Sequence, residues 1–171
     1  MPVNSFAGIF SLVRLAFAVA AGAVILPGAA LAAAGPVAPA WKLKDLAGHE
    51  VSSGQFKGKV VVVDFWATWC TPCVSEIPGY IELQKKYGPD GLIIVGISLD
   101  QSGPAHVQKF ASAKGMNYTI VMGDDEVVEA FGGIEAIPTT ILIGRDGRIV
   151  HRKSGAMPHA EYEELVKQAL K

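Results

Sequence analysis

The stretch VVVVDFWATWCTPC, residues 60–73, decides the fold and poses the question of function. Four consecutive valines lead into Asp64, two aromatic residues follow, and the stretch ends in a Cys-x-x-Cys pair, Cys70 and Cys73. A continuous β-branched run of this kind is typical of a strand buried on both faces of a sheet. An acid at the end of such a strand needs an explanation, because a carboxylate loses its hydration there.

The two cysteines are the only ones in the chain. A disulfide between Cys70 and Cys73 closes a four-residue loop, which stabilises a fold by about 2 kcal/mol at most. Such a bridge is a poor structural staple, but it can be opened and closed readily. The pair therefore indicates a redox-active disulfide rather than a structural one.

The cysteine pair is followed by the helical periodicity of residues 72–87. Unpaired N–H groups and the helix dipole favour negative charge at a helix start, so Cys70 is expected to have a lowered pKa and to act as the nucleophile. Pro72 suits the first turn, where its missing N–H costs nothing. Cys73, one turn inside, would resolve the mixed disulfide and release the reduced substrate.

Two acids lie close to the pair in sequence. If Asp64 is buried behind Cys73, it can take the proton of that thiol. If it points outward at the sheet edge, it is simply solvated, and spacing alone does not decide between the two. Glu76 lies three residues after Cys73 and shares its helix face. It is either a second proton relay or an ordinary solvated glutamate.

Metal binding by the cysteine pair has little support in the sequence. A zinc site of this type needs a second pair of ligands, which the chain lacks. A two-cysteine Cu(I) site stays open as an alternative, because thiolates are soft ligands. We expect no metal and no cofactor beyond the disulfide. The remaining candidate ligands are interpreted as surface or packing residues: His49, His106, His151 and His159.

The rest of the chain from residue 41 predicts a single α/β domain over residues 41–171 with a central mixed sheet. Strands and helices alternate first, and a hairpin with an Asp-Gly turn and a final helix come last. The expected strands are a hairpin over 41–53 with its turn near Ala47-Gly48, then 58–66, 92–100, 118–121, 139–144 and 148–153. The expected helices are 72–87, 104–114, 125–131 and 159–171.

The N-terminal segment has the composition of a secretory signal. It contains one charged residue, Arg14, followed by an apolar run over 15–26 and then small residues. We predict a signal peptide over 1–32, with Ala30-Leu31-Ala32 as the cleavage site. Residues 33–40 then form a linker.

An uncleaved anchor is the alternative, because about 20 apolar residues suffice to span a bilayer. In either case we expect the domain in the periplasm, with membrane contact only if the segment is uncleaved. The net charge of −1 becomes −2 without Arg14. This weak acidity offers no electrostatic surface for nucleic acid.

The motifs resemble those of a known family. DFWATWCTPC at 64–73, E-I-P at 76–78 and I-P-T at 137–139 are similar to those of the thioredoxin superfamily, and more narrowly of exported TlpA/ResA-like thiol–disulfide oxidoreductases. The resemblance covers about residues 41–171. It implies a thioredoxin-like fold with an N-terminal β-hairpin and an inserted αβ segment around 104–121.

The same resemblance implies roles for individual residues. Cys70 would be the attacking thiol and Cys73 the resolving one. Pro138 matches the family's cis-proline, a state that the sequence alone does not indicate. Ile137 would pair its backbone with an extended substrate peptide. Trp69 would form part of the docking surface.

Thr71 and Pro72, the dipeptide between the cysteines, would belong to that docking surface too. Glu76 matches the acid that tunes the cysteine pair in ResA-like proteins. That branch often carries Asn where Asp64 stands, whereas cytoplasmic thioredoxins carry a buried Asp there. The chain thus holds both acids, which favours the proton-relay hypothesis for Asp64.

The dipeptide Thr71-Pro72 lacks the histidine of strong oxidants, so we expect a reductant of protein disulfides. The resemblance implies apocytochrome c or a copper-assembly protein as client, and a membrane thiol donor as the source of electrons. Three alternatives stay open: a peroxiredoxin-like peroxidase, a periplasmic oxidant and a Cu(I) carrier. The peroxidase is disfavoured because Ala67 stands where that class needs a Thr.

Overall fold

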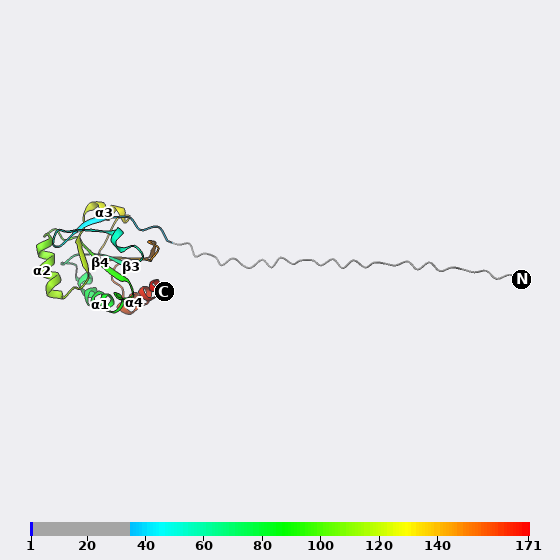
Figure 1. The fold of residues 1–171 in the computed structure, drawn as a ribbon. Helices are drawn as coiled ribbons and strands as arrows, with labels where there is room; N and C mark the ends of the chain where they lie inside the picture. Colours follow the sequence, from blue (N-terminus) through cyan, green and yellow to red (C-terminus); the bar gives the residue numbers. More distant parts are fainter. Residues whose placement is uncertain (2–34) are drawn as a thin grey trace. The chain divides into compact units, whose positions relative to one another are not determined.

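The computed structural model describes Met1 and residues 35–171, and residues 2–32 of the predicted signal peptide and residues 33–34 of the linker lie outside this part. Within it, seven strands form one mixed sheet in the order β2-β1-β5-β4-β3-β6-β7 (Figure 1). The strands are β1 Lys42–Asp45, β2 Glu50–Ser52, β3 Val60–Trp66, β4 Leu92–Ser98, β5 Thr119–Met122, β6 Thr139–Ile143 and β7 Ile149–Ser154. The helices are the 3-10 turn η1 Ser53–Phe56, α1 Thr71–Tyr87, α2 Pro104–Lys114, α3 Asp125–Ala130 and α4 His159–Leu170.

Strand β3 lies near the middle of the sheet and every one of its residues is buried. It pairs in parallel with β4 and antiparallel with β6, so it has a partner along each edge. This position accounts for the run of valines, because a strand covered on both faces has no side that must be polar. The expectation of a buried central strand is confirmed.

The alternation of side chains along β3 separates two layers of core. Val61, Val63 and Phe65 face the layer that contains Val127 and Phe131, from α3 and the residue after it. Val60 and Val62 face the opposite layer, packed against side chains of α1 and α4. Figure 1 shows α3 on one side of the sheet and α1 with α4 on the other.

The same alternation fixes where Asp64 points. It belongs to the set of Val60, Val62 and Trp66, so its side chain faces the layer of α1 and α4. Trp66, the next residue of that set, packs in one cluster with both cysteines. Asp64 is therefore held between the α1–α4 core and the cysteine pair.

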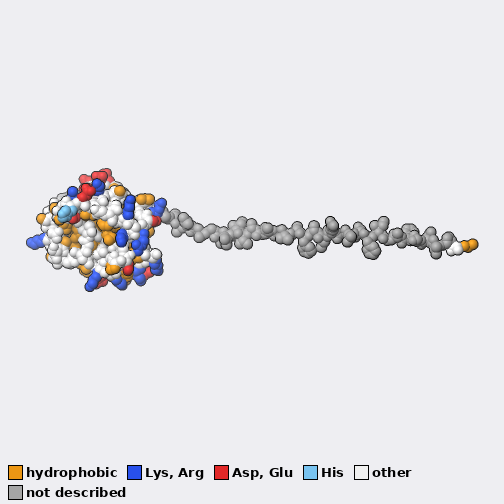
Figure 2. Space-filling view, in the orientation of Figure 1, with side chains coloured by type: hydrophobic (Ala, Val, Ile, Leu, Met, Phe, Trp, Pro, Cys, Tyr) orange, Lys and Arg blue, Asp and Glu red, His pale blue; other side chains and the backbone are white. Residues whose placement is uncertain are grey.

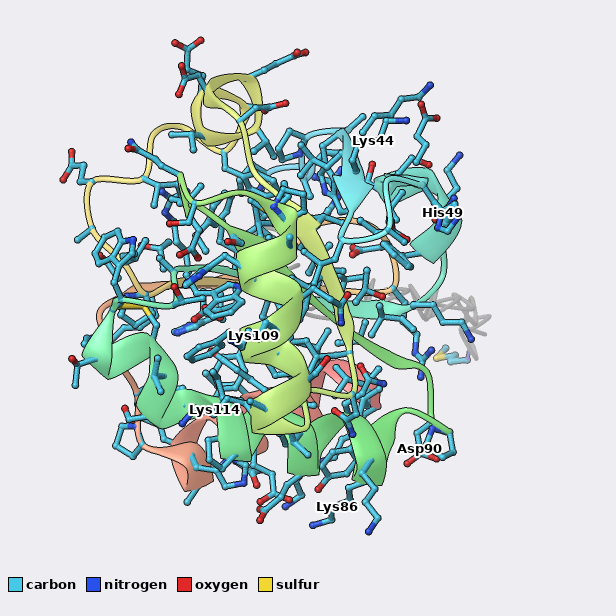
Figure 3. The ribbon with its side chains drawn as sticks, turned by 90° about the vertical axis from the view of Figure 1, so that its left-hand side faces the viewer. Lys44, His49, Lys86, Asp90, Lys109 and Lys114 are labelled. Atoms are coloured by element: carbon cyan, nitrogen blue, oxygen red, sulfur yellow. A yellow bond between two sulfur atoms is a disulfide. The ribbon has the colours of Figure 1, made fainter. Side chains whose placement is uncertain are left out.

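The inserted segment consists of α2 and β5. In Figure 3, α2 lies in front of the sheet with Lys109 and Lys114 along it, and α1 crosses below. Val107 and Ala111 turn the buried face of α2 toward the cluster that contains the cysteines. The insertion thus covers the α1 side of the sheet next to the candidate site.

Most predicted elements agree with the structure to within two residues, and the α/β fold with a mixed sheet is confirmed. Residues 36–38, within the predicted linker, pair with the start of β7: Val37 bridges Arg148, and Ile149 donates its N–H to Pro36 O at 2.9 Å. Contacts of the domain therefore extend upstream of Trp41. No helix in the described part is long and apolar enough to cross a bilayer.

Candidate active site

The cysteine pair lies at the junction of β3 and α1. The chain leaves β3 at Trp66 and makes a turn that the Cys70 N–H closes by donating to Ala67 O at 3.1 Å. Cys70 is the N-cap of α1, and its sulfur accepts from the Cys73 N–H at 3.3 Å. The two cysteines form a disulfide with their Cα atoms 5.3 Å apart, as the spacing predicted.

Both sulfurs sit in a largely buried setting beneath an exposed rim. Cys70 and Cys73 are buried, while Thr71 and Pro72 between them are exposed. Trp69, immediately before the pair, is 69% exposed. So large an apolar side chain in water is typical of a surface that binds another molecule.

A second segment completes the rim opposite the turn. The Ile137–Pro138 peptide bond is cis, as the resemblance implied. The Ile137 carbonyl oxygen lies 3.6 Å from Cys70 Sγ. Ile137 and Pro138 are 67 and 68 residues away from Cys70 in sequence, and the antiparallel pairing of β3 with β6 brings them together.

Asp64 is buried, with 3% of its surface exposed, so the outward-pointing alternative is wrong. Its Oδ1 accepts from Thr140 Oγ1 at 3.4 Å, the one hydrogen bond to its side chain among the described residues. Burial, with a further contribution from the nearby Glu76 carboxylate, raises the pKa of Asp64 to about 8. The group is therefore mostly protonated below about pH 8 and can accept a proton once it ionises above that value.

Glu76 lies half-buried on α1, one turn after Cys73. Its Oε1 accepts from the Met157 N–H at 2.9 Å, and its Oε2 is buried without a partner among the described residues. Burial raises the pKa of Glu76, and the bond from Met157 opposes that rise. It is not the freely solvated helix glutamate that the alternative describes.

A hydroxyl pair that sequence reasoning missed connects Asp64 to α1. Tyr80 OH and Thr140 Oγ1 are 3.0 Å apart, and Thr140 in turn donates to Asp64. Burial and the Asp64 carboxylate raise the pKa of Tyr80. No sequence signal marks this pair, because its members are 60 residues apart.

The other potential ligand groups lie elsewhere. No cluster of three or more His, Cys, Asp or Glu side chains suited to a metal occurs in the part of the chain that the structure describes. His49 pairs with Asp45 and His159 with Glu82. All four histidines are expected to be surface or packing residues, and His106 differs from the others because it contacts the turn before the cysteines. Its Nε2 lies 3.1 Å from Thr68 Oγ1.

Neither surface charge nor the large cleft points to a second site. Figure 2 shows acidic side chains beside basic ones on the face drawn. A cleft of about 990 Å³ opens between the hairpin of β1 and β2, η1 and the β6–β7 turn, and neither cysteine lines it. The chemistry therefore belongs to the exposed rim around the disulfide and not to this cleft.

The chain is similar to known thiol–disulfide oxidoreductases. The Redoxin family model matches residues 33–168. ResA, a thiol–disulfide oxidoreductase, is 32% identical over 135 residues in Bacillus thuringiensis subsp. konkukian (strain 97-27), covering 78% of this chain and 77% of that protein. ResA of Bacillus subtilis (strain 168) is 33% identical over 137 residues, covering 78% and 75%.

Solved structures show the same fold. A thiol:disulfide interchange protein of the thioredoxin family from Chlorobium tepidum TLS matches with a TM-score of 0.74 and 33% identity, covering 80% of this chain and 97% of that one. StoA from Bacillus subtilis matches with a TM-score of 0.63 and 27% identity, covering 75% and 98%. The thioredoxin-like architecture expected from the motifs is confirmed.

The raised pKa of Asp64 predicts how stability depends on pH. Between about pH 4 and pH 8 the folded protein holds a proton at Asp64 that the unfolded chain releases, so stability falls as pH rises. We expect Asp64→Asn to change the stability of the oxidised protein little at pH 4. At pH 8 the variant should be more stable than the parent by a few kcal/mol, on the order expected for a shift of several pKa units.

Denaturant unfolding of the disulfide form from pH 4 to pH 8 measures this difference. The same change at the exposed Asp90 controls for the loss of one charge. A difference between the Asp64 variant and the parent that stays constant across the range would contradict the raised pKa.

Proposed function

The chain belongs to the Redoxin family and is a thiol–disulfide oxidoreductase, and from this premise we propose that it reduces protein disulfides in the periplasm. The observation that carries the proposal is a buried disulfide under an exposed apolar rim. Its Cys70 sulfur lies 3.6 Å from a carbonyl of the opposite segment. A site built this way suits an extended peptide that lies across the rim.

The reaction proceeds by two exchanges, starting from the dithiol. The Cys70 thiolate attacks one sulfur of the client disulfide, forms a mixed disulfide and expels the other client sulfur as a thiolate. Cys73 then loses its proton and attacks Cys70 Sγ, which releases the second client thiol. Two electrons pass to the client, and the Cys70–Cys73 disulfide is formed.

The position of Cys70 at the helix start supports its attacking role. Its sulfur already accepts the Cys73 N–H, so the N-terminus of α1 stabilises negative charge on Cys70. Cys73 is the more deeply buried of the two and is one turn inside the helix. A client sulfur therefore reaches Cys70 first, and Cys73 attacks only after the mixed disulfide has formed.

The client peptide is held by the rim. Ile137 offers its backbone to an extended segment, in the manner of strand addition. Trp69 supplies apolar contact area, and Thr71 and Pro72 are exposed next to Cys70. Pro138 is buried directly after Ile137 and completes the opposite segment. Recognition through backbone and apolar contacts suits a partly unfolded protein with an accessible cystine.

Asp64 accepts the proton of Cys73, and Glu76 exchanges it with solvent. Asp64 belongs to the buried layer that joins the cysteine cluster, whereas Glu76 is half-exposed. The two carboxyl groups influence each other, since the Glu76 charge raises the Asp64 pKa. A proton that arrives at Asp64 thus favours ionisation of Glu76, which moves charge outward.

Thr71-Pro72 supports the proposed direction of electron transfer, and the predicted signal peptide supports the proposed compartment. Thr71-Pro72 contains no histidine to stabilise the reduced form, which favours a reductant. The predicted signal peptide directs the domain to an oxidising compartment, where electrons must come from a membrane thiol donor. Clients of the proposed type are apocytochrome c before haem attachment or the cysteines of a copper-site assembly protein.

The assigned roles predict that Cys73→Ser accumulates mixed disulfides with clients. The resolving thiol is absent in this variant, so the exchange stops at the bond between Cys70 and the client. Cys70→Ser is the matched control and should trap none. Non-reducing gels followed by mass spectrometry of the trapped partners measure both; equal trapping by the two variants would refute the assignment of roles.

The proposed direction predicts a low reduction potential. Equilibration of the full-length chain with glutathione buffers should place the Cys70–Cys73 couple well below about −150 mV. A value near −120 mV, that of the strong oxidants, would instead support a periplasmic oxidant.

A further inference from the structure

A buried acid that the exchange chemistry does not use lies beside the nucleophile turn. Asp100 follows the end of β4 by two residues and is 7% exposed. Its Oδ2 accepts from the Thr68 N–H at 2.9 Å and from Ser98 Oγ at 2.8 Å. Its Oδ1 accepts from Thr68 Oγ1 at 2.6 Å. Both carboxyl oxygens therefore accept hydrogen bonds, and two of these three bonds come from Thr68.

Thr68 is the second residue of the turn that leads into the disulfide. That turn starts at Ala67, closes at Cys70 and carries Trp69 between them. A backbone bond from the Leu99 N–H to Trp66 O at 2.8 Å joins the end of β4 to the residue before the turn. The Asp100 side chain adds hydrogen bonds to Thr68 from the residue after Leu99. The segment after β4 therefore holds the chain both just before the turn, at Trp66, and within it, at Thr68.

The link continues to the inserted helix. Because the Thr68 hydroxyl donates to Asp100, it accepts from the Nε2–H of His106, which lies 3.1 Å away. His106 lies in the first turn of α2 and is exposed. It is the one histidine in the described part whose ring contacts the turn before the cysteines.

We propose that Asp100 is a positioning residue for the nucleophile: through Thr68 it fixes the turn that carries Trp69 and Cys70. The turn cannot move away without leaving a buried carboxylate unpaired, which is strongly unfavourable. A fixed turn holds Cys70 Sγ against Ile137 and holds the Trp69 ring at the rim. The proposal rests on thiol–disulfide exchange itself and is independent of direction, compartment and client.

The negative charge of Asp100 has a second consequence for Cys70. Asp100 forms no ion pair among residues 35–171, and the titratable side chain that its hydrogen bonds reach there is His106, through Thr68. A like charge near a thiol opposes its ionisation. Asp100 thus makes the Cys70 thiolate less stable and the dithiol a better electron donor.

Asp100→Asn tests the charge, because it keeps the size of the side chain and removes the anion. The pH profile of Cys70 alkylation in the reduced full-length chain gives the pKa of the thiol. We expect that pKa to fall by roughly half a unit to one unit, because a like charge is removed from the side of the turn that Thr68 faces. A role in stability alone would leave this profile unmoved.

Thr68→Val tests the positioning, because it keeps the backbone N–H and the charge of Asp100 but removes the hydroxyl. The rate of reduction of a cystine-containing test peptide, divided by the fraction of Cys70 that is thiolate, isolates geometry from ionisation. We expect this rate to fall about tenfold in both Thr68→Val and Asp100→Asn, the order of loss for a misplaced reacting group. The double variant should lose no more than the worse single variant, since both break one link.

Two controls complete the set. Thr68→Ser keeps the N–H and the hydroxyl, and should stay within twofold of the parent. Asp45→Asn changes a carboxylate that accepts two backbone N–H bonds in the β1–β2 turn, away from the cysteines, and should do the same. Circular dichroism shows whether each variant is folded. If Asp100→Asn does not fold, the rates per thiolate of Thr68→Val and Thr68→Ser decide whether the link positions the turn.

The proposal is overturned if a folded Asp100→Asn or Thr68→Val protein keeps its rate per thiolate within twofold of the parent. It is equally overturned if the Cys70 pKa is unmoved in Asp100→Asn. Loss of rate in both variants, with the pKa shift and with both controls unaffected, supports it.

Discussion

Complete burial of β3 is the constraint on which the rest of this structure depends. The strand is covered on both faces and paired along both edges, so each side chain on it is committed to one of two core layers. Alternation then leaves Asp64 no route to solvent and sends it toward α1. At the end of the strand, the chain must turn before α1 begins, and that turn carries the nucleophile. The acid, the turn and the helix cap are therefore consequences of one buried strand.

The two acids behind the disulfide differ because their surroundings differ. Asp64 has one long hydrogen bond from Thr140 and almost no exposure, so burial dominates its pKa. Glu76 keeps one oxygen on the Met157 N–H and reaches the surface in part. Two carboxyl groups with separated affinities for protons are what a stepwise transfer requires. A single buried acid would accept the proton of Cys73 but would have no partner through which to release it.

The sequence predicts what depends on local pattern and on runs of apolar residues. The valines before Asp64 indicate β3, Gly115 ends α2 in the left-handed conformation, and Asp146-Gly147 marks the last hairpin. The site is predictable only where its residues share one segment, as Cys70 and Cys73 do. The cis bond at Pro138 came from the family resemblance, since the residues alone do not distinguish it.

The remaining contacts of the site join residues too far apart for any pattern to reveal. Thr68 and Asp100 are 32 residues apart, and Glu76 and Met157 are 81 apart. The sequence predicts a strand over 92–100 that includes Asp100, but β4 ends at Ser98 and Asp100 turns back to accept from Thr68. The apolar run reaches as far as Leu99 and gives no sign of that change of direction. Long-range pairing of buried polar groups is settled by the packed fold rather than by local spacing.

If Asp64 is the proton acceptor for Cys73, the rate at which the mixed disulfide resolves must depend on it, and this rate is the most direct test. The complex of Cys70 with a test peptide is formed rapidly, and its decay is followed by quenched flow from pH 6 to pH 9. In the parent, the rate should rise as Asp64 ionises, with a midpoint near pH 8. Asp64→Asn should resolve about tenfold or more slowly above that midpoint, the usual order for loss of a general base. An unchanged rate and profile in the folded variant would contradict the account.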